Sequence, residues 1–103
     1  HFLGPARTIV VQHHERWAGG GYPAGLAGEQ IFIGARIVAV TDTYDAMRSV
    51  RPHCKDSHHA AVVEELNRCA GSQFDPAVVE AFLQMPASVL EDLRATSFLE
   101  PAR

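Results

Sequence analysis

The chain has 103 residues, of which 47% are hydrophobic and 20% charged, and its formal net charge at pH 7 is −3. This length suffices for one small domain. The mild acidity excludes the strongly basic surface of a DNA- or RNA-binding protein and offers nothing to an anionic membrane. No apolar run approaches the roughly 20 residues of a membrane span. The two cysteines, Cys54 and Cys69, lack CxxC spacing, so we expect reduced thiols in a cytoplasmic protein.

The first predicted helix covers residues 5–15 and begins with a proline, which suits a first helical turn. His13 and His14 each follow an apolar residue by four positions, so each imidazole is expected to stack over an apolar side chain. Neighbouring helical positions point about 100° apart. The two imidazoles could therefore serve two different metals, or a metal and a substrate. The alternative is a pair of partly exposed histidines without such a role.

Residues 16–30 are predicted to form an ordered loop, here called the glycine-rich loop. Five glycines and one proline within ten positions require unusual backbone angles. Trp17 and Tyr22 distinguish the segment from a flexible linker, which would be rich in Gly and Ser and lack aromatic residues. We expect this loop to pack on the body of the domain.

A second helix is predicted over residues 33–49, where apolar residues recur at spacings of 4, 3, 4 and 3 and would form one buried face. They are Ile33, Ile37, Val40, Tyr44 and Met47. A third helix is expected over residues 58–69, with Ser57 as its N-cap and Gly71 just beyond its end.

Asp75 followed by Pro76 predicts the start of a fourth helix, because an acid suits the N-cap and proline suits the first helical position. Residues 88–91 have the form of a capping box, which indicates a short last helix. The sequence therefore predicts an all-α bundle of about five helices with one long ordered loop near its start.

Asp42 is a candidate metal ligand because it follows an apolar run on a helix that we expect to be largely buried. A buried carboxylate without a partner costs several kcal/mol. A metal ion or hydrogen bonds would offset this cost, and so would an ion pair with Arg36, Arg48 or Arg51. Asp45, three residues further on, shares the same side of the helix. Both explanations remain open at this point.

Arg51 is a candidate phosphate-binding residue. It precedes Pro52 just beyond the end of the second predicted helix. A guanidinium held there can bind a phosphate through two parallel hydrogen bonds. An ordinary surface arginine is the alternative.

Together these features resemble the HD-GYP family in their order and spacing. The matching segments are His13-His14-Glu15-Arg16-Trp17, Gly19-Gly20-Gly21-Tyr22-Pro23, Gly25-Leu26, Gly28-Glu29, Ala35-Arg36-Ile37, Asp42-Thr43-Tyr44-Asp45-Ala46, Arg51-Pro52 and Gln73-Phe74-Asp75-Pro76. The resemblance is strongest over residues 10–83. It identifies residues 1–103 as the C-terminal portion of an HD-GYP domain.

This resemblance implies an HD-like helical bundle that hydrolyses the phosphodiester bonds of cyclic di-GMP. It implies two or three divalent metal ions, commonly iron or manganese, in the complete domain. His13, His14 and Asp42 would be metal ligands. Arg51 would bind a substrate phosphate, and Lys55, one position later than the lysine usual in the family, would assist it.

The resemblance also implies neighbours for this segment. The Gly21-Tyr22-Pro23 loop would flank the site and could dock a diguanylate cyclase (GGDEF) domain. The His-Asp pair that names the fold would precede His1, so we expect no complete catalytic site within these residues. Helices deprived of the missing half would expose apolar surface, which predicts a homo-oligomer.

A second reading comes from positions where the chain departs from the family. Ala18 stands where an acid is usual, and Cys54 stands where lysine or arginine is usual. These departures favour a degenerate HD-GYP regulatory module that binds a nucleotide or a partner domain without turnover. His58 and His59 match no ligand of the family, and we expect them in a solvated first helical turn.

Overall fold

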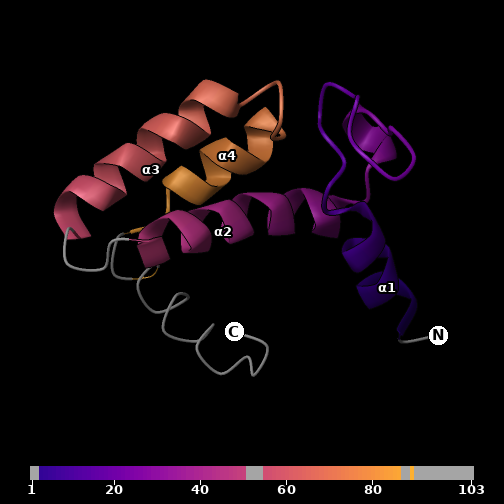
Figure 1. Ribbon diagram of the computed structural model, residues 1–103, viewed down its shortest axis with the longest axis horizontal. Coiled ribbons are helices and arrows are strands. Elements are labelled where there is room, and N and C mark those ends of the chain that lie inside the picture. Colours follow the sequence, from indigo (N-terminus) through magenta and orange to yellow (C-terminus); the bar gives the residue numbers. More distant parts are fainter. Residues whose placement is uncertain (1–2, 51–54, 87–88, 90–103) are drawn as a thin grey trace.

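The structure is a computed structural model that describes residues 3–50, 55–86 and 89. Its elements are α1 (Leu3–Gln12), the 3-10 helix η1 (Gly28–Gln30), α2 (Ile33–Val50), α3 (Lys55–Cys69) and α4 (Pro76–Leu83) (Figure 1). No strand occurs in this described part, where Ala70 and Phe74 form an isolated bridge. The all-α prediction is therefore confirmed. The last predicted helix, around residues 88–91, falls outside the described residues except for Val89.

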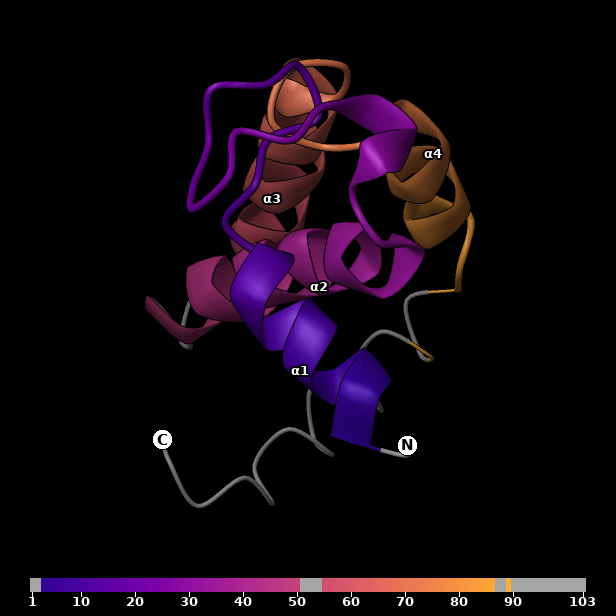
Figure 2. The same cartoon turned by 90° about the vertical axis from the view of Figure 1, so that its right-hand side faces the viewer.

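The long helix α2 is the centre of the molecule. Helices α3 and α4 pack along it, while α1 crosses it near its N-terminus, beside the glycine-rich loop (Figures 1 and 2). The crossing depends on Gly34, where a Cβ would lie 2.8 Å from Cδ1 of Ile9. The missing side chain lets the two helices approach closely. None of the described helices is both long and apolar enough to cross a lipid bilayer.

The core lies between α2, α3 and α4. Its buried residues are Val40, Tyr44, Val62, Leu66, Cys69, Phe74, Val79 and Phe82. The predicted apolar face of α2 is only partly right, because Ile33 and Ile37 are each 46% exposed. Ala35, 1% exposed, is buried in their place, beside Ile31 of the loop connection. The segment just before α2, which includes Ile31, thus lies beside Ala35 in the first turn of α2.

The predicted start of α4 is confirmed, whereas the predicted start of α3 is not. Asp75 caps α4 as predicted, accepting a hydrogen bond from the Ala77 main-chain N–H at 2.9 Å. The predicted start of α3 is wrong, because the helix begins at Lys55 and contains Ser57. Gly71 follows α3 with φ +92°, a left-handed conformation that favours glycine at a helix C-terminus.

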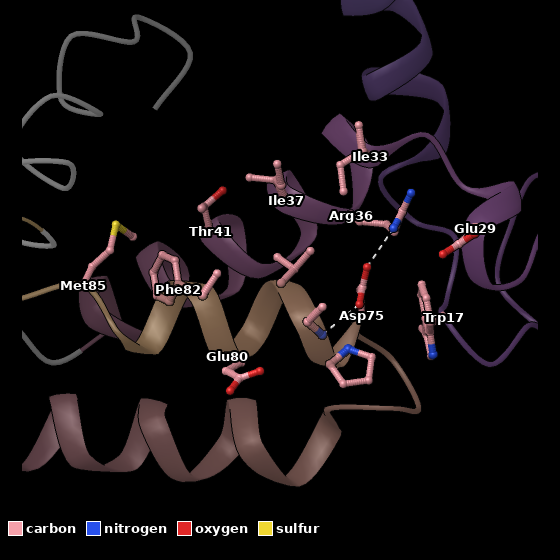
Figure 3. A pocket seen from close by; sticks show the side chains of 14 residues that line it. Trp17, Glu29, Ile33, Arg36, Ile37, Thr41, Asp75, Glu80, Phe82 and Met85 are labelled. Carbon is pink, nitrogen blue, oxygen red and sulfur yellow. Dashed lines mark hydrogen bonds and ion pairs between the residues drawn. The ribbon is translucent and has the colours of Figure 1, made fainter.

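An ion pair between Arg36 and Asp75 joins three parts of the fold (Figure 3). Nη1 of Arg36 donates to Oδ2 of Asp75 at 2.8 Å, and the side chains are 15% and 5% exposed. Nε of Arg36 donates to the Ile31 carbonyl at 2.9 Å, and the guanidinium lies 5.8 Å from the Trp17 ring centroid. Arg36, one suggested partner of Asp42, therefore binds the cap of α4 instead.

We predict that Asp75→Ala lowers the free energy of unfolding by about 3 kcal/mol, since it removes a helix cap and leaves Arg36 without its partner. Asp75→Asn keeps an oxygen that can accept from the Ala77 N–H, so it should cost less. Urea unfolding followed by far-UV circular dichroism measures both. Glu80→Ala, at an exposed position of the same helix, is the control and should stay within about 0.5 kcal/mol of the wild type. Equal losses for Asp75→Ala and Glu80→Ala would contradict the assignment.

The homo-oligomer expected from the sequence stays a prediction. Val10 is 66% exposed, and Ile33 and Ile37 are 46% exposed, so apolar side chains face solvent on α1 and α2. Such surface favours association. Sedimentation velocity at micromolar concentration should show species larger than one chain, and Ile37→Glu should shift them toward the monomer. A monodisperse wild-type monomer would contradict this prediction.

Candidate functional site

The imidazole rings of His13 and His14 lie side by side immediately after α1. Their centroids are 4.0 Å apart and their planes are inclined by 39°. The main-chain N–H of His13 still donates to the Ile9 carbonyl at 3.0 Å, but α1 ends at Gln12 and the chain turns there. The prediction of two helical histidines that point about 100° apart is therefore wrong. The turn brings both imidazoles together instead.

The tautomer of His13 is set by its contact with α1. Its Nδ1 lies 2.7 Å from the carbonyl oxygen of Val10, which can only accept a hydrogen bond. In the neutral ring this contact places the proton on Nδ1, which leaves the lone pair on Nε2. Metal-binding histidines in proteins commonly hold their second ring N–H in this way. His13 is thus suited to bind a metal ion through Nε2.

Glu15 is a buried carboxylate that anchors the glycine-rich loop. It is 4% exposed, and its Oε2 and Oε1 accept the main-chain N–H groups of Ala24 at 2.8 Å and Leu26 at 2.9 Å. Glu15 lies within the family-like segment His13-His14-Glu15-Arg16-Trp17, but the sequence did not predict its role. The available signal was an acid next to a glycine-rich run, whose main-chain donors need acceptors once they are buried.

The loop folds back onto the histidines at Gly21 and Tyr22. A Cβ at Gly21 would lie 2.6 Å from the His14 carbonyl oxygen and 2.8 Å from Cα of Glu15, so only glycine fits there. The Tyr22 ring stacks on the His14 imidazole, with centroids 4.9 Å apart and planes inclined by 18°. The bond between Tyr22 and Pro23 is cis. The predicted ordered loop is confirmed, and Tyr22 borders the imidazole pair.

The start of the glycine-rich loop is hydrogen-bonded to the turn between α3 and α4. The main-chain N–H of Trp17 donates to the Gln73 carbonyl at 3.1 Å, and that of Ala18 donates to the Ser72 carbonyl at 2.8 Å. Within the loop, the Gly28 N–H donates to the Trp17 carbonyl at 2.8 Å. The expectation that the loop packs on the body is thus confirmed.

Asp42 is exposed, so the burial that we expected for it is wrong. The reason is helical geometry: Asp42 lies two positions from both Val40 and Tyr44, and about 100° per residue turns it away from that buried face. Across the described ranges, no three His, Cys, Asp or Glu side chains group closely enough to hold a metal ion. The structure therefore unites His13 with His14 and does not add Asp42 to them.

The two candidate phosphate-binding residues lie between α2 and α3. Arg51 is outside the described residues, and Lys55 is the first residue of α3. Their roles stay predictions.

Cys69 is not a candidate nucleophile. It belongs to the core, and burial, together with a hydrogen bond to Glu65, raises the pKa of its thiol. A thiol of raised pKa carries little thiolate near neutral pH and is chemically inert.

A groove of about 1030 Å³ lies between α2 and α4 (Figure 3). Its lining is mainly apolar and includes Ile33, Ile37, Phe82 and Met85. No histidine lines it, so it is separate from the imidazole pair. Because imidazoles bind metals and the groove offers no such group, the candidate site is the histidine pair with its loop.

Comparison with known proteins links this chain to one family. The family model described as HD domain matches residues 1–78. The chain is 45% identical over 82 residues to a cyclic di-GMP phosphodiesterase of Vibrio cholerae serotype O1, covering 80% of this chain and 17% of that protein. It is 41% identical over 86 residues to a cyclic di-GMP phosphodiesterase of Thermotoga maritima, covering 84% and 23% respectively.

A third relative has a different substrate in its name. The 3′3′-cGAMP-specific phosphodiesterase 2 of Vibrio cholerae serotype O1 is 38% identical over 79 residues, covering 77% of this chain and 15% of that protein. The chain thus spans less than a quarter of the length of each of these three relatives.

Gly21→Ala is expected to lower the free energy of unfolding by about 2 kcal/mol, because the new methyl group would meet main-chain atoms that cannot give way. Gly4→Ala in α1 is the matched control, since a Cβ there meets nothing within 4 Å. That change should be neutral or stabilise by up to about 1 kcal/mol through helix propensity. Thermal unfolding of both variants tests the difference. If Gly21→Ala proved as stable as Gly4→Ala, the close approach of Gly21 to the main chain of His14 and Glu15 would be contradicted.

Proposed function

The chain belongs to the HD domain family, within its HD-GYP group, and we propose from this that it takes part in metal-dependent hydrolysis of cyclic di-GMP in its natural protein. The observation that carries the proposal is the adjacent imidazole pair of His13 and His14. It stands within residues 1–78, which match the HD domain family model.

His13 and His14 are proposed as ligands of a divalent metal ion, iron or manganese. Imidazole nitrogen suits iron, and His13 presents Nε2 because its Nδ1 proton is held by Val10. A bound ion of this kind stabilises negative charge on phosphoryl oxygens. The side chains fit part of a ligand set, since the two rings are adjacent and His14 is exposed.

Further ligands are proposed from two sources. The exposed carboxylate of Asp42 is one, on the helix against which α1 packs. The others would come from polypeptide outside the described residues, which assemble no group of three ligands among themselves. Two or three ions would then be held in the complete domain.

We propose that Arg51 and Lys55 bind the substrate. Both side chains are cationic, follow α2 closely in the sequence and can pair with phosphate oxygens. Docking of a diguanylate cyclase (GGDEF) domain on the loop around Tyr22 stays a prediction. Tyr22 is 61% exposed, which leaves this loop accessible.

The natural protein that contains these residues provides the test. His13→Ala and His14→Ala should each reduce the metal content measured by mass spectrometry. Hydrolysis of cyclic di-GMP should fall by at least about 100-fold, since even outer partners of metal ligands are worth 10–100-fold. His59→Ala, which removes an imidazole in α3, should leave both within about twofold. Assays with 3′3′-cGAMP establish which cyclic dinucleotide is preferred.

Two outcomes would overturn the proposal. If His13→Ala and His14→Ala load as much metal as the wild type, the imidazole pair is not the metal site. If the natural protein binds metal and cyclic di-GMP without product formation, the regulatory module is correct, as the departures Ala18 and Cys54 favour.

A further inference from the structure

We propose that Glu15 and Tyr22 are positioning residues for the metal ligand His14. In this arrangement, the Glu15 carboxylate fixes the glycine-rich loop, and the loop holds the Tyr22 ring against the His14 imidazole. The inference rests on the proposed function, because it takes His14 to be a ligand.

The two imidazoles are oriented by different means. His13 is held by its hydrogen bond to Val10 at 2.7 Å. The ring of His14 makes no hydrogen bond to any residue that the structure describes, and its neighbours are the rings of His13 and Tyr22. A ligand without a hydrogen-bonded partner keeps rotational freedom unless packing removes it. Stacking on Tyr22, with planes inclined by 18°, therefore restricts His14.

Tyr22 cannot be held in place by burial, since it is 61% exposed. Its position comes from the main chain on both sides. Before it, Gly21 lies so close to the His14 carbonyl that a Cβ would be 2.6 Å away. The main-chain N–H of Tyr22 donates to the same His14 carbonyl at 3.4 Å. The backbone that carries the tyrosine is thus fixed against the backbone that carries the histidine.

After Tyr22, the loop is held by Glu15. The carboxylate accepts from Ala24 and Leu26 at 2.8 and 2.9 Å, and hydrogen bonds to an ionised acceptor are the stronger kind. Because Glu15 directly follows His14 in the chain, the anchor and the ligand share one stretch of backbone. Glu15 therefore restrains the loop, the loop positions the Tyr22 ring, and that ring stacks on the imidazole of His14.

The stacked ring, not the hydroxyl, is the part of Tyr22 that this arrangement requires. An imidazole that gives its lone pair to a cation becomes electron-poor, and the electron-rich face of an aromatic ring stabilises it. Phenylalanine keeps that face and alanine does not. The conservative substitution therefore separates positioning from a loss of loop structure.

The experiment uses the whole natural protein with Tyr22→Phe, Tyr22→Ala and Glu15→Gln. The dissociation constant for Mn²⁺ is measured by electron paramagnetic resonance. The ring signals of isotope-labelled histidine are followed by NMR in the metal-free protein. Tyr22→Phe should keep the Mn²⁺ affinity within about twofold. Tyr22→Ala and Glu15→Gln should weaken it about tenfold, the loss typical of an orienting partner. Both should also abolish the ring-current shift of the His14 signals.

Two controls isolate the effect. Glu29→Gln changes an exposed acid of the same loop and should alter neither measurement. His14→Ala should abolish tight Mn²⁺ binding if the proposed function is right. If His14→Ala binds Mn²⁺ as the wild type does, the proposed function fails.

If His14→Ala loses the metal while Tyr22→Ala keeps both the affinity and the NMR shift, only the positioning role fails. Equal weakening by Tyr22→Phe and Tyr22→Ala would also overturn it. Should Glu15→Gln not fold, the comparison of the two Tyr22 variants still decides the role of the ring.

Discussion

The buried carboxylate of Glu15 and the two main-chain N–H groups that it accepts are the constraint on which the N-terminal end of the molecule depends. A charge removed from water needs such partners, and the N–H groups of Ala24 and Leu26 supply them. The burial of Glu15 therefore depends on the position of the loop. The pair of Arg36 and Asp75 follows the same rule on the far side of the loop, where Trp17 lies against the guanidinium. Three charged side chains with satisfied hydrogen bonds, Glu15, Arg36 and Asp75, thus lie around this irregular segment.

Features encoded by neighbouring residues could be predicted from the sequence. The start of α4 follows from Asp75 and Pro76, because cap and first-turn preferences are local. The loop was predictable from its glycines, and its packing from Trp17, which lies half-buried near Arg36. The HD-GYP resemblance supplied the family, and the comparisons agree with it. The proposed roles in metal and phosphate binding stay predictions, because the described residues do not bring three metal ligands together and Arg51 lies outside them.

Features decided by distant contacts could not be predicted. The spacing of apolar residues continued a helix through His14, whereas α1 ends at Gln12 and Glu15 accepts hydrogen bonds from the distant Ala24 and Leu26. The surrounding apolar residues suggested a buried Asp42, whereas burial along α2 depends on which side its neighbours cover. Ile37 is exposed for the same reason, because α1, α3 and α4 pack against other parts of the surface of α2. Periodicity indicates that a helix has an inner face but does not say what will lie against it.

The attachment of the loop to the turn after α3 has a consequence for biosynthesis. Trp17 and Ala18 are synthesised before their main-chain acceptors, Gln73 and Ser72, which lie more than fifty residues later in the chain. Contacts between distant parts of a chain form only after the intervening segment has been ordered. We therefore expect the start of the loop to gain its attachment to the body only after α3 and the turn that follows it have been made.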